Sequence, residues 1–207
     1  MKTFKLLAII SILTTAASAQ TPGFFLSLGN GIVFLKNEPI TDTSPDGKIV
    51  HSGNAWNSVP IVRFEAGYQF TEHVDLALQI TKYYDADIMG VRFDTNRRYA
   101  LVPSYTFALG KRIRIHASTG IVCSISHSRE DGPIEKHPEV TKRSWDYLTS
   151  LTLEVVFNRY LSAGLRGAYA PYEISLPPVI MNSGSVKPSR SVNLDAYELG
   201  LTFTYRP

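Results

Sequence analysis

The sequence predicts an all-β fold, an eight-stranded antiparallel up-and-down transmembrane β-barrel. Apolar and polar residues alternate along most of the chain, which is the period of two of a β-strand. Between these strands, very short connections alternate with long polar segments. Past the amino end, no stretch approaches the roughly 20 apolar residues of a membrane-spanning helix. A closed barrel is the other structure that pairs every backbone group inside a bilayer.

The amino end predicts a secretory signal peptide. Lys2 and Lys5 precede the apolar run Leu6–Leu13, and Ala17-Ser18-Ala19 has the small residues of a cleavage site. The run is too short to span a bilayer as a helix. We therefore expect cleavage after Ala19, with a signal peptide at residues 1–19 and one barrel domain at residues 20–207.

The composition of the chain argues against a nucleic-acid partner and against an internal disulfide. The chain has a net charge of +3, and the loss of Lys2 and Lys5 would leave about +1, so a nucleic-acid partner is not expected. Cys123 is the only cysteine, so the chain cannot form an internal disulfide. Its predicted position on the apolar face favours a small hydrophobic role over redox work.

Eight alternating segments predict the eight strands. They are residues 24–35, 58–70, 74–83, 98–109, 112–126, 144–157, 160–169 and 197–205. Four long polar segments, residues 36–56, 84–96, 127–143 and 171–193, separate the hairpins. Tight turns on one rim and long loops on the other are typical of membrane barrels.

The last predicted strand carries the most specific signal. Glu198, Gly200, Phe203 and Tyr205 have the spacing of the assembly signal of bacterial outer-membrane barrels: a polar residue, Gly two on, and aromatics five and seven on. Many members of that group end on the last aromatic, whereas Arg206 and Pro207 follow it here.

Over the region after the signal peptide, the sequence resembles the small OmpA-like and OmpX-like barrels. The resemblance implies an outer-membrane location, insertion by the barrel assembly machinery with help from periplasmic chaperones, and contact with lipopolysaccharide. It also implies a monomer, with the short turns in the periplasm and the long loops outside the cell, where a loop could bind an extracellular ligand.

The composition of the polar face predicts that it points into the barrel. It consists mostly of small residues with charges of both signs, whereas a water-facing exterior would be rich in Lys and Glu. Buried charges need partners, and we expect Arg166 to meet Glu154 and Glu198, and the pair Arg63 and Glu65 to meet Asp75. Aromatic residues near both ends of the strands predict two membrane-interface belts.

Two prolines do not suit a barrel strand. Pro60 and Pro103 lack the N–H that a ladder needs, so a bulge or distorted ladder is expected at each. Gly29 and Gly31, in contrast, suit interior positions of close approach.

A search for catalytic residues finds one candidate set. His116, Ser118 and Glu130 resemble, loosely, the His/Ser/Glu set of the lipid A deacylase barrels, but Thr119 stands where that family has Asn. Alternation points His116 and Ser118 into the lumen and puts Glu130 in a loop, so we interpret the pair as interior polar filling.

No catalytic, cofactor-binding or metal-binding residue is assigned. His51, His127 and His137 fall in predicted loops and His73 in a turn, without convergent ligands. The expected function is that of a non-enzymatic outer-membrane barrel whose loops serve structural, adhesion or binding roles. The alternatives are a lipid A-modifying enzyme and a soluble, lipocalin-like periplasmic barrel with its apolar face inward.

Overall fold

The computed structural model describes ten segments of the chain. These are residues 22–37, 40–43, 49–52, 56–84, 86–88, 91–130, 139–176, 178–180, 186–187 and 190–207. The predicted signal peptide lies outside them. Within these segments the regular structure is entirely β, and no helix long and apolar enough to cross a membrane is found.

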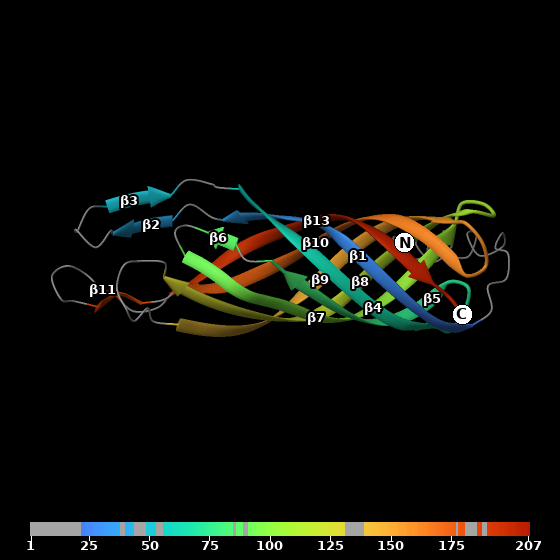
Figure 1. Cartoon of the computed structure of the whole chain (residues 1–207), viewed down its shortest axis with the longest axis horizontal. Coiled ribbons are helices and arrows are strands. Elements are labelled where there is room, and N and C mark those ends of the chain that lie inside the picture. Colours follow the sequence, from blue (N-terminus) through green and yellow to red (C-terminus); the bar gives the residue numbers. More distant parts are fainter. Residues whose placement is uncertain are drawn as a thin grey trace, which may run out of the picture.

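Eight long antiparallel strands close into a barrel (Figure 1). They are β1 (Gly23–Asn37), β4 (Trp56–Gln69), β5 (Val74–Tyr83), β7 (Val91–Ala108), β8 (Ile113–Glu130), β9 (Glu139–Val156), β10 (Leu161–Leu176) and β13 (Arg190–Tyr205). Each strand pairs with its neighbours in chain order. The first and last strands pair over twelve positions, from Leu26 with Tyr205 to Asn37 with Leu194, and complete the cylinder.

Five short strands lie at one end of the barrel (Figure 1). They are β2 (Ile40–Thr43), β3 (Ile49–Ser52), β6 (Ala86–Ile88), β11 (Val179–Ile180) and β12 (Val186–Lys187). β2 pairs with β3, β11 pairs with β12, and β6 extends the main sheet along β7. We call this end the loop rim.

The opposite end, the turn rim, carries three tight connections and the carboxyl end of the chain (Figure 1). In residues 70–73 the Thr71 hydroxyl accepts a hydrogen bond from the backbone N–H of Val74 at 3.1 Å. In residues 157–160 the Asn158 side chain accepts one from Leu161 at 3.0 Å. Gly110 has φ +152°, a conformation that L-residues rarely adopt, and this lets the chain reverse within residues 109–112.

The strands agree with the sequence prediction in number and order but extend further. The first and last residues of β5, Val74–Tyr83, are those of the predicted strand. On the loop-rim side the others run into the predicted loops: β7 starts at Val91, β8 continues to Glu130, β9 starts at Glu139, and β10 continues to Leu176. Backbone pairing between these polar arms, rather than an apolar face, continues the strands.

The barrel is inverted in polarity relative to a soluble domain. Thirty large hydrophobic side chains are exposed on the described surface, most of them along the outward face of the strands; Ile121, for example, is 64% exposed, whereas its neighbour Val122 is fully buried. Charged and polar side chains are buried in the lumen, among them Arg63, Glu154, Arg166 and Glu198. A lipocalin-like barrel needs the opposite arrangement.

The two strand prolines behave differently. The β7–β8 ladder has a gap at Val102 and Pro103, between the pairs Leu101–Ile121 and Ser104–Ser118, so the expected distortion is confirmed there. At Pro60 the prediction is wrong: Pro60 pairs in register with Ile32, and its carbonyl accepts a hydrogen bond from Tyr84. The irregularity in register lies instead between Phe93 and Thr95.

Candidate functional site in the barrel lumen

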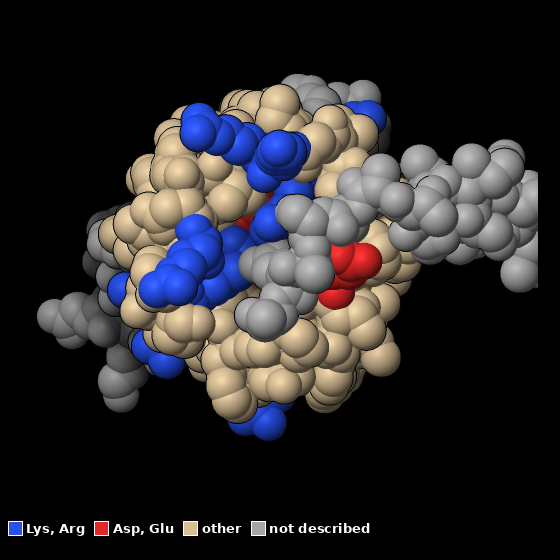
Figure 2. Space-filling view, turned by 90° about the vertical axis from the view of Figure 1, so that its right-hand side faces the viewer, with Lys and Arg blue, Asp and Glu red and all other residues tan. Residues whose placement is uncertain are grey.

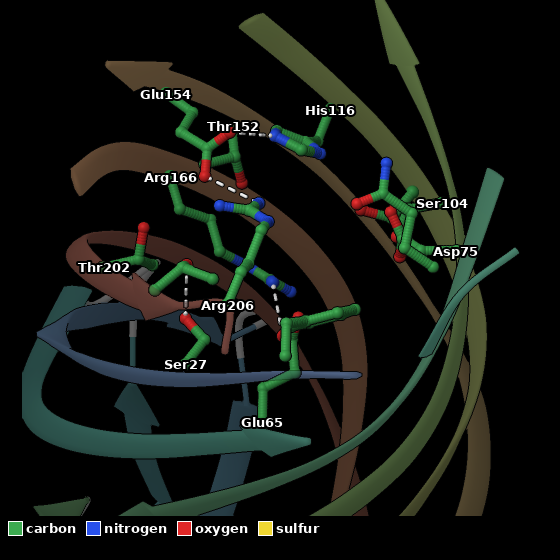
Figure 3. Close-up of a pocket in the computed structure, with 14 residues that line it drawn as sticks. Ser27, Glu65, Asp75, Ser104, His116, Thr152, Glu154, Arg166, Thr202 and Arg206 are labelled. Atoms are coloured by element: carbon green, nitrogen blue, oxygen red, sulfur yellow. Dashed lines mark hydrogen bonds and ion pairs between the residues drawn. The ribbon is translucent and has the colours of Figure 1, made fainter. Parts of the chain in front are cut away.

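A hydrogen-bonded cluster around Glu154 fills the lumen near the turn rim (Figure 3). His116 lies between Thr106 and Glu154: its Nδ1 is 2.9 Å from the Thr106 hydroxyl and its Nε2 is 2.8 Å from Glu154 Oε2. Thr106 and His116 are direct partners across the β7–β8 hairpin, and Glu154 comes from β9. Arg114 lies 3.9 Å from the same carboxylate oxygen.

Arg206 closes this cluster from beyond the last strand. Its guanidinium donates to Glu154 Oε1 and to the Ser162 hydroxyl, both at 2.8 Å, and the Ser162 hydroxyl also donates to Glu154. The Arg206 backbone N–H bonds the carbonyl of Tyr160 at 2.8 Å, which fixes the residue against the turn rim. The residue that departs from the pattern of the outer-membrane assembly signal is therefore part of the lumen.

A second charged cluster occupies the middle of the lumen. Arg63 pairs with Glu198, and both side chains are almost fully buried. Arg166 approaches Glu65 at 3.5 Å and Glu198 at 3.9 Å, and donates a hydrogen bond to the Gln79 side chain at 3.0 Å. Each of these buried charges therefore has at least one oppositely charged neighbour, as charges taken out of water require.

Gly29 makes room for this second cluster. A Cβ at Gly29 would lie 2.8 Å from a guanidinium nitrogen of Arg63, closer than real side chains approach. At Gly31 a Cβ would lie 2.4 Å from the carbonyl oxygen of Leu199. The predicted close-approach role of both glycines is confirmed.

The predicted interior ion pairs are correct in part. Arg166 does meet Glu198, but its second acidic partner is Glu65, because Glu154 lies with His116 and Arg206. Arg63 pairs with Glu198 rather than with Asp75. Asp75 lies opposite Ser104 across β5 and β7 and accepts a hydrogen bond from its hydroxyl.

A small polar cavity lies between the two clusters. The space open to the centres of water molecules is ≈ 50 Å³, and its lining includes Ser27, Glu65, His116, Arg166 and Arg206. That volume suits a few waters bridging polar groups. It is far below the roughly 300 Å³ at which small-molecule sites begin, so the cavity cannot hold a lipid or a sugar.

An apolar layer fills the lumen on the loop-rim side of these clusters. Ala100, Val102, Val122, Leu148 and Ala170 form a buried cluster contributed by four adjacent strands. The sequence predicts a lumen lined mostly by small residues and charges of both signs, so this layer, with the larger side chains of Leu148, Val102 and Val122, is an addition that sequence reasoning missed. Its side chains and those of the two charged clusters occupy an interior that, with eight strands, is just wide enough for side chains.

The predicted catalytic set does not come together. His116 and Ser118 face the lumen as expected, but the Ser118 hydroxyl bonds Ser150 at 3.0 Å and not His116. Glu130 ends β8, fourteen residues along the same strand from His116, or about 46 Å at 3.3 Å per residue. The side chains bonded to His116 are Thr106 and Glu154, and pairing across the Gly110 turn could have indicated Thr106.

The other described histidines lie on different elements. His73 sits in a turn, where it stacks on Tyr105 and bonds the carbonyl of Thr106 at 3.0 Å. His127 lies in β8 rather than in a loop and bonds Thr141. His51 is in β3, and His137 falls outside the described residues. No group of metal-ligating side chains converges within the described segments.

The turn rim is rich in positive charge. Lys and Arg side chains gather over this end of the molecule (Figure 2). Lys111 and Arg112 lie in one turn and Arg159 in another, with Arg206 at the mouth of the lumen. The same rim also has an acidic residue, Glu72, in the connection at residues 70–73.

Comparison with solved structures relates this architecture to known proteins. The AlkL outer-membrane protein in lipid bilayers matches with a TM-score of 0.61 and 14% identity over 94% of each chain. OprG of Pseudomonas aeruginosa matches with a TM-score of 0.56 and 9% identity over 89% of this chain and 97% of that one. Neisserial surface protein A matches with a TM-score of 0.54 and 12% identity over 90% of this chain and 98% of that one.

Sequence comparison adds nothing to this relationship: no protein-family model and no curated protein sequence matches the chain. At these identities the structural likeness establishes the fold. The chain has the closed, eight-stranded, all-antiparallel architecture of the small outer-membrane β-barrels.

Proposed function

We propose that this protein is an integral outer-membrane β-barrel without enzymatic activity, which presents its long loops outside the cell for structural, adhesion or binding roles. The observation that carries the proposal is the inverted polarity, an exposed apolar wall around a lumen of buried charges. Such a wall is stable only where lipid covers it, and the backbone pairing of a closed barrel meets the demands of a bilayer.

The filled lumen supports a role outside the barrel rather than through it. Eight strands leave an interior just wide enough for side chains. Here the middle is occupied by Arg63, Arg166 and Glu198, and the turn-rim mouth by Arg206 and Glu154. A transported solute would have to break these buried contacts, whereas the arms at the loop rim are open to partners.

The orientation follows from the two rims. By the resemblance to outer-membrane barrels, the turn rim faces the periplasm and the loop rim faces outward. The signal peptide at residues 1–19, with cleavage after Ala19, would deliver the chain to the periplasm. The assembly machinery and periplasmic chaperones would then act on the carboxyl-terminal strand, and the protein would work as a monomer.

A fractionation experiment tests the membrane part of this proposal. The mature chain should be recovered in the outer-membrane fraction and should migrate faster on gels when left unheated, because the closed barrel resists detergent. Protease added outside intact cells should cut in the predicted loops and spare the turns. Recovery of the protein as a soluble periplasmic species would overturn the assignment.

One arrangement favours an enzyme as a second candidate. Thr106, His116 and Glu154 form the hydroxyl–imidazole–carboxylate sequence of an activated nucleophile, with contacts of 2.9 and 2.8 Å. His116 and Glu154 line a cavity of only ≈ 50 Å³, and this small volume opposes access by a lipid. We expect the mass spectrum of lipid A to be the same with and without the protein. A change in acylation that His116→Ala abolishes, while Ser150→Ala preserves it, would establish the enzyme.

A further inference from the structure

The two basic connections of the turn rim are joined through the backbone. The carbonyl of Arg112 accepts a hydrogen bond from the N–H of Val156 at 2.8 Å. Val156 is the last residue of β9 and leads directly into the connection at residues 157–160. The carbonyl of Tyr160, the last residue of this connection, in turn accepts the hydrogen bond from the N–H of Arg206. These contacts bring together four basic residues, which we call the basic face: Lys111, Arg112, Arg159 and Arg206.

Short-range contacts hold the basic face in shape. The Asn158 side chain accepts a hydrogen bond from the backbone N–H of Tyr160 at 2.8 Å. The guanidinium of Arg159 lies over the ring of Tyr160, with its Cζ 4.3 Å from the ring centre. In the other connection, the N–H of Leu109 bonds the carbonyl of Ile113 at 2.9 Å. A partner would therefore not have to order this backbone on binding, which lowers the entropy cost of association.

The exposed cations of the basic face have no acidic partner beside them. Lys111, Arg112 and Arg159 are exposed, and none of them forms an ion pair with a residue that the structure describes. Neither of their two connections contains Asp or Glu. Glu154 is buried in the lumen, and Glu72 belongs to the third connection of the rim. The basic face therefore presents positive charge to whatever lies beyond the turn rim.

The basic face covers the end of the barrel rather than its wall. Figure 2 shows Lys and Arg side chains crossing this end from its edge toward its centre. Arg206 lies at the mouth of the lumen, where its guanidinium binds Glu154 and Ser162. Lipid surrounds the wall of a membrane barrel and meets this end only at its edge. A molecule on the aqueous side, in contrast, can lie across the whole end, so the arrangement favours a partner from that side.

We propose that the basic face docks an acidic, extended segment of a periplasmic protein, with carboxylates of that segment against Lys111, Arg112 and Arg159. Guanidinium groups form strong, paired hydrogen bonds with carboxylates. Complementary charge on the two partners also speeds their encounter and selects against other partners. The docking rests on the orientation in the proposed function, because only a turn rim in the periplasm would meet such a protein.

Fluorescence anisotropy of a labelled peptide tests the docking on the folded mature chain in phosphatidylcholine nanodiscs. The probe is a peptide of alternating Asp and Ser, and its neutral match has Asn in place of each Asp. K111Q/R112Q/R159Q should bind the acidic peptide roughly 10-fold more weakly than the unmodified chain, because three exposed ion pairs are lost. Raising the ionic strength should weaken the binding to the unmodified chain as well, because salt screens exposed charges.

The control variant removes the same charge from the other end of the barrel. K82Q/R97Q/R143Q replaces three exposed basic residues of the outer wall near the loop rim. β7 is about 36 Å long from Arg97 to Ala108, at about 3.3 Å per residue, whereas charges in water are screened over about 8 Å. The control variant should therefore change the affinity less than about two-fold. Both variants are checked for heat-modifiable migration, so that only folded barrels are compared.

Three results would overturn the docking site. They are equal weakening by the two triple variants, equal binding of the neutral peptide, and loss of peptide binding when phosphatidylglycerol replaces phosphatidylcholine, which would assign the cations to a lipid headgroup. Arg159→Cys, made together with Cys123→Ser, tests the orientation separately. A membrane-impermeant maleimide should label it only after the outer membrane is opened. Labelling in intact cells would contradict the proposed function and leave the peptide measurement standing.

Discussion

The lumen has two halves that are stabilised in different ways. Toward the turn rim and in the middle, charged side chains from distant strands are tied together, as in the pairs Arg63–Glu198 and Arg206–Glu154. Toward the loop rim, Leu148, Val122 and their apolar neighbours form a packed layer, beside buried polar side chains such as Ser124. The stability of the turn-rim half therefore depends on the pairing of its charges, and that of the loop-rim half depends on how well side-chain volume fills the space. The comparison teaches that a barrel interior need not be polar throughout in order to be enclosed by lipid.

The largest expected effect is in the middle cluster. Glu198→Leu removes the carboxylate that pairs with the guanidinium of Arg63 and that also lies near Arg166. Breaking a buried ion pair by removing one partner costs about 3–5 kcal/mol. Urea unfolding of the folded chain in lipid vesicles would measure the loss. The control is Glu173→Gln at the half-exposed pair with Lys142, which should cost less than about 1 kcal/mol.

The double variant R63M/E198L sharpens this prediction. Removing both charges takes away the penalty of an unpaired ion, so the double variant should recover part of the stability that Glu198→Leu loses. A double variant less stable than Glu198→Leu would contradict the description of this half as dependent on charge pairing.

In the apolar half, the free energy of unfolding should depend on side-chain volume. Leu148 is 1% exposed, and Leu148→Ala should lower the free energy of unfolding by about 3 kcal/mol through the cavity that it leaves. Leu148→Met keeps most of the volume and should cost less than about 1.5 kcal/mol. The same urea titration measures both, and equal losses for the two variants would argue against close packing in this half.

The smallest effect is expected at the turn-rim mouth. Arg206→Ala removes charge-assisted hydrogen bonds to Glu154 and Ser162, but Glu154 keeps His116, so about 2 kcal/mol should be lost. Arg112→Ala, an exposed arginine of the same rim, should change the stability by no more than about 0.5 kcal/mol. If the two variants are equally stable, Arg206 does not hold the mouth of the lumen.

Period-two alternation was enough to predict the strands and their number, and the composition of the polar face predicted that this face points inward. Local pattern decides these properties, as the agreement at Val74–Tyr83 illustrates. The strand extensions could not be predicted because the arms at the loop rim alternate weakly, and only pairing with a neighbour makes them strands. The regular pairing at Pro60 likewise depends on its neighbours rather than on the missing N–H alone.

The interior contacts were harder to predict than the faces. The alternation of side chains along each strand placed His116, Glu154 and Arg166 in the lumen. A contact across the lumen also depends on how the strands are staggered relative to one another, and the sequence of one strand does not show this. Glu154 therefore met Arg206 rather than Arg166. Thr106 was within reach of prediction, because the tight turn at Gly110 sets it opposite His116.

The central claim is that the apolar face of the strands lies in lipid and the polar face in the lumen. Ile121→Cys, made together with Cys123→Ser, carries a nitroxide spin label at a wall position that is 64% exposed. In vesicles the label should be relaxed strongly by oxygen, which enters the bilayer, and weakly by a water-soluble nickel chelate. A label at Arg112→Cys in the same background, on the turn rim, should show the reverse. Strong relaxation of the Ile121→Cys label by the nickel chelate would contradict the account.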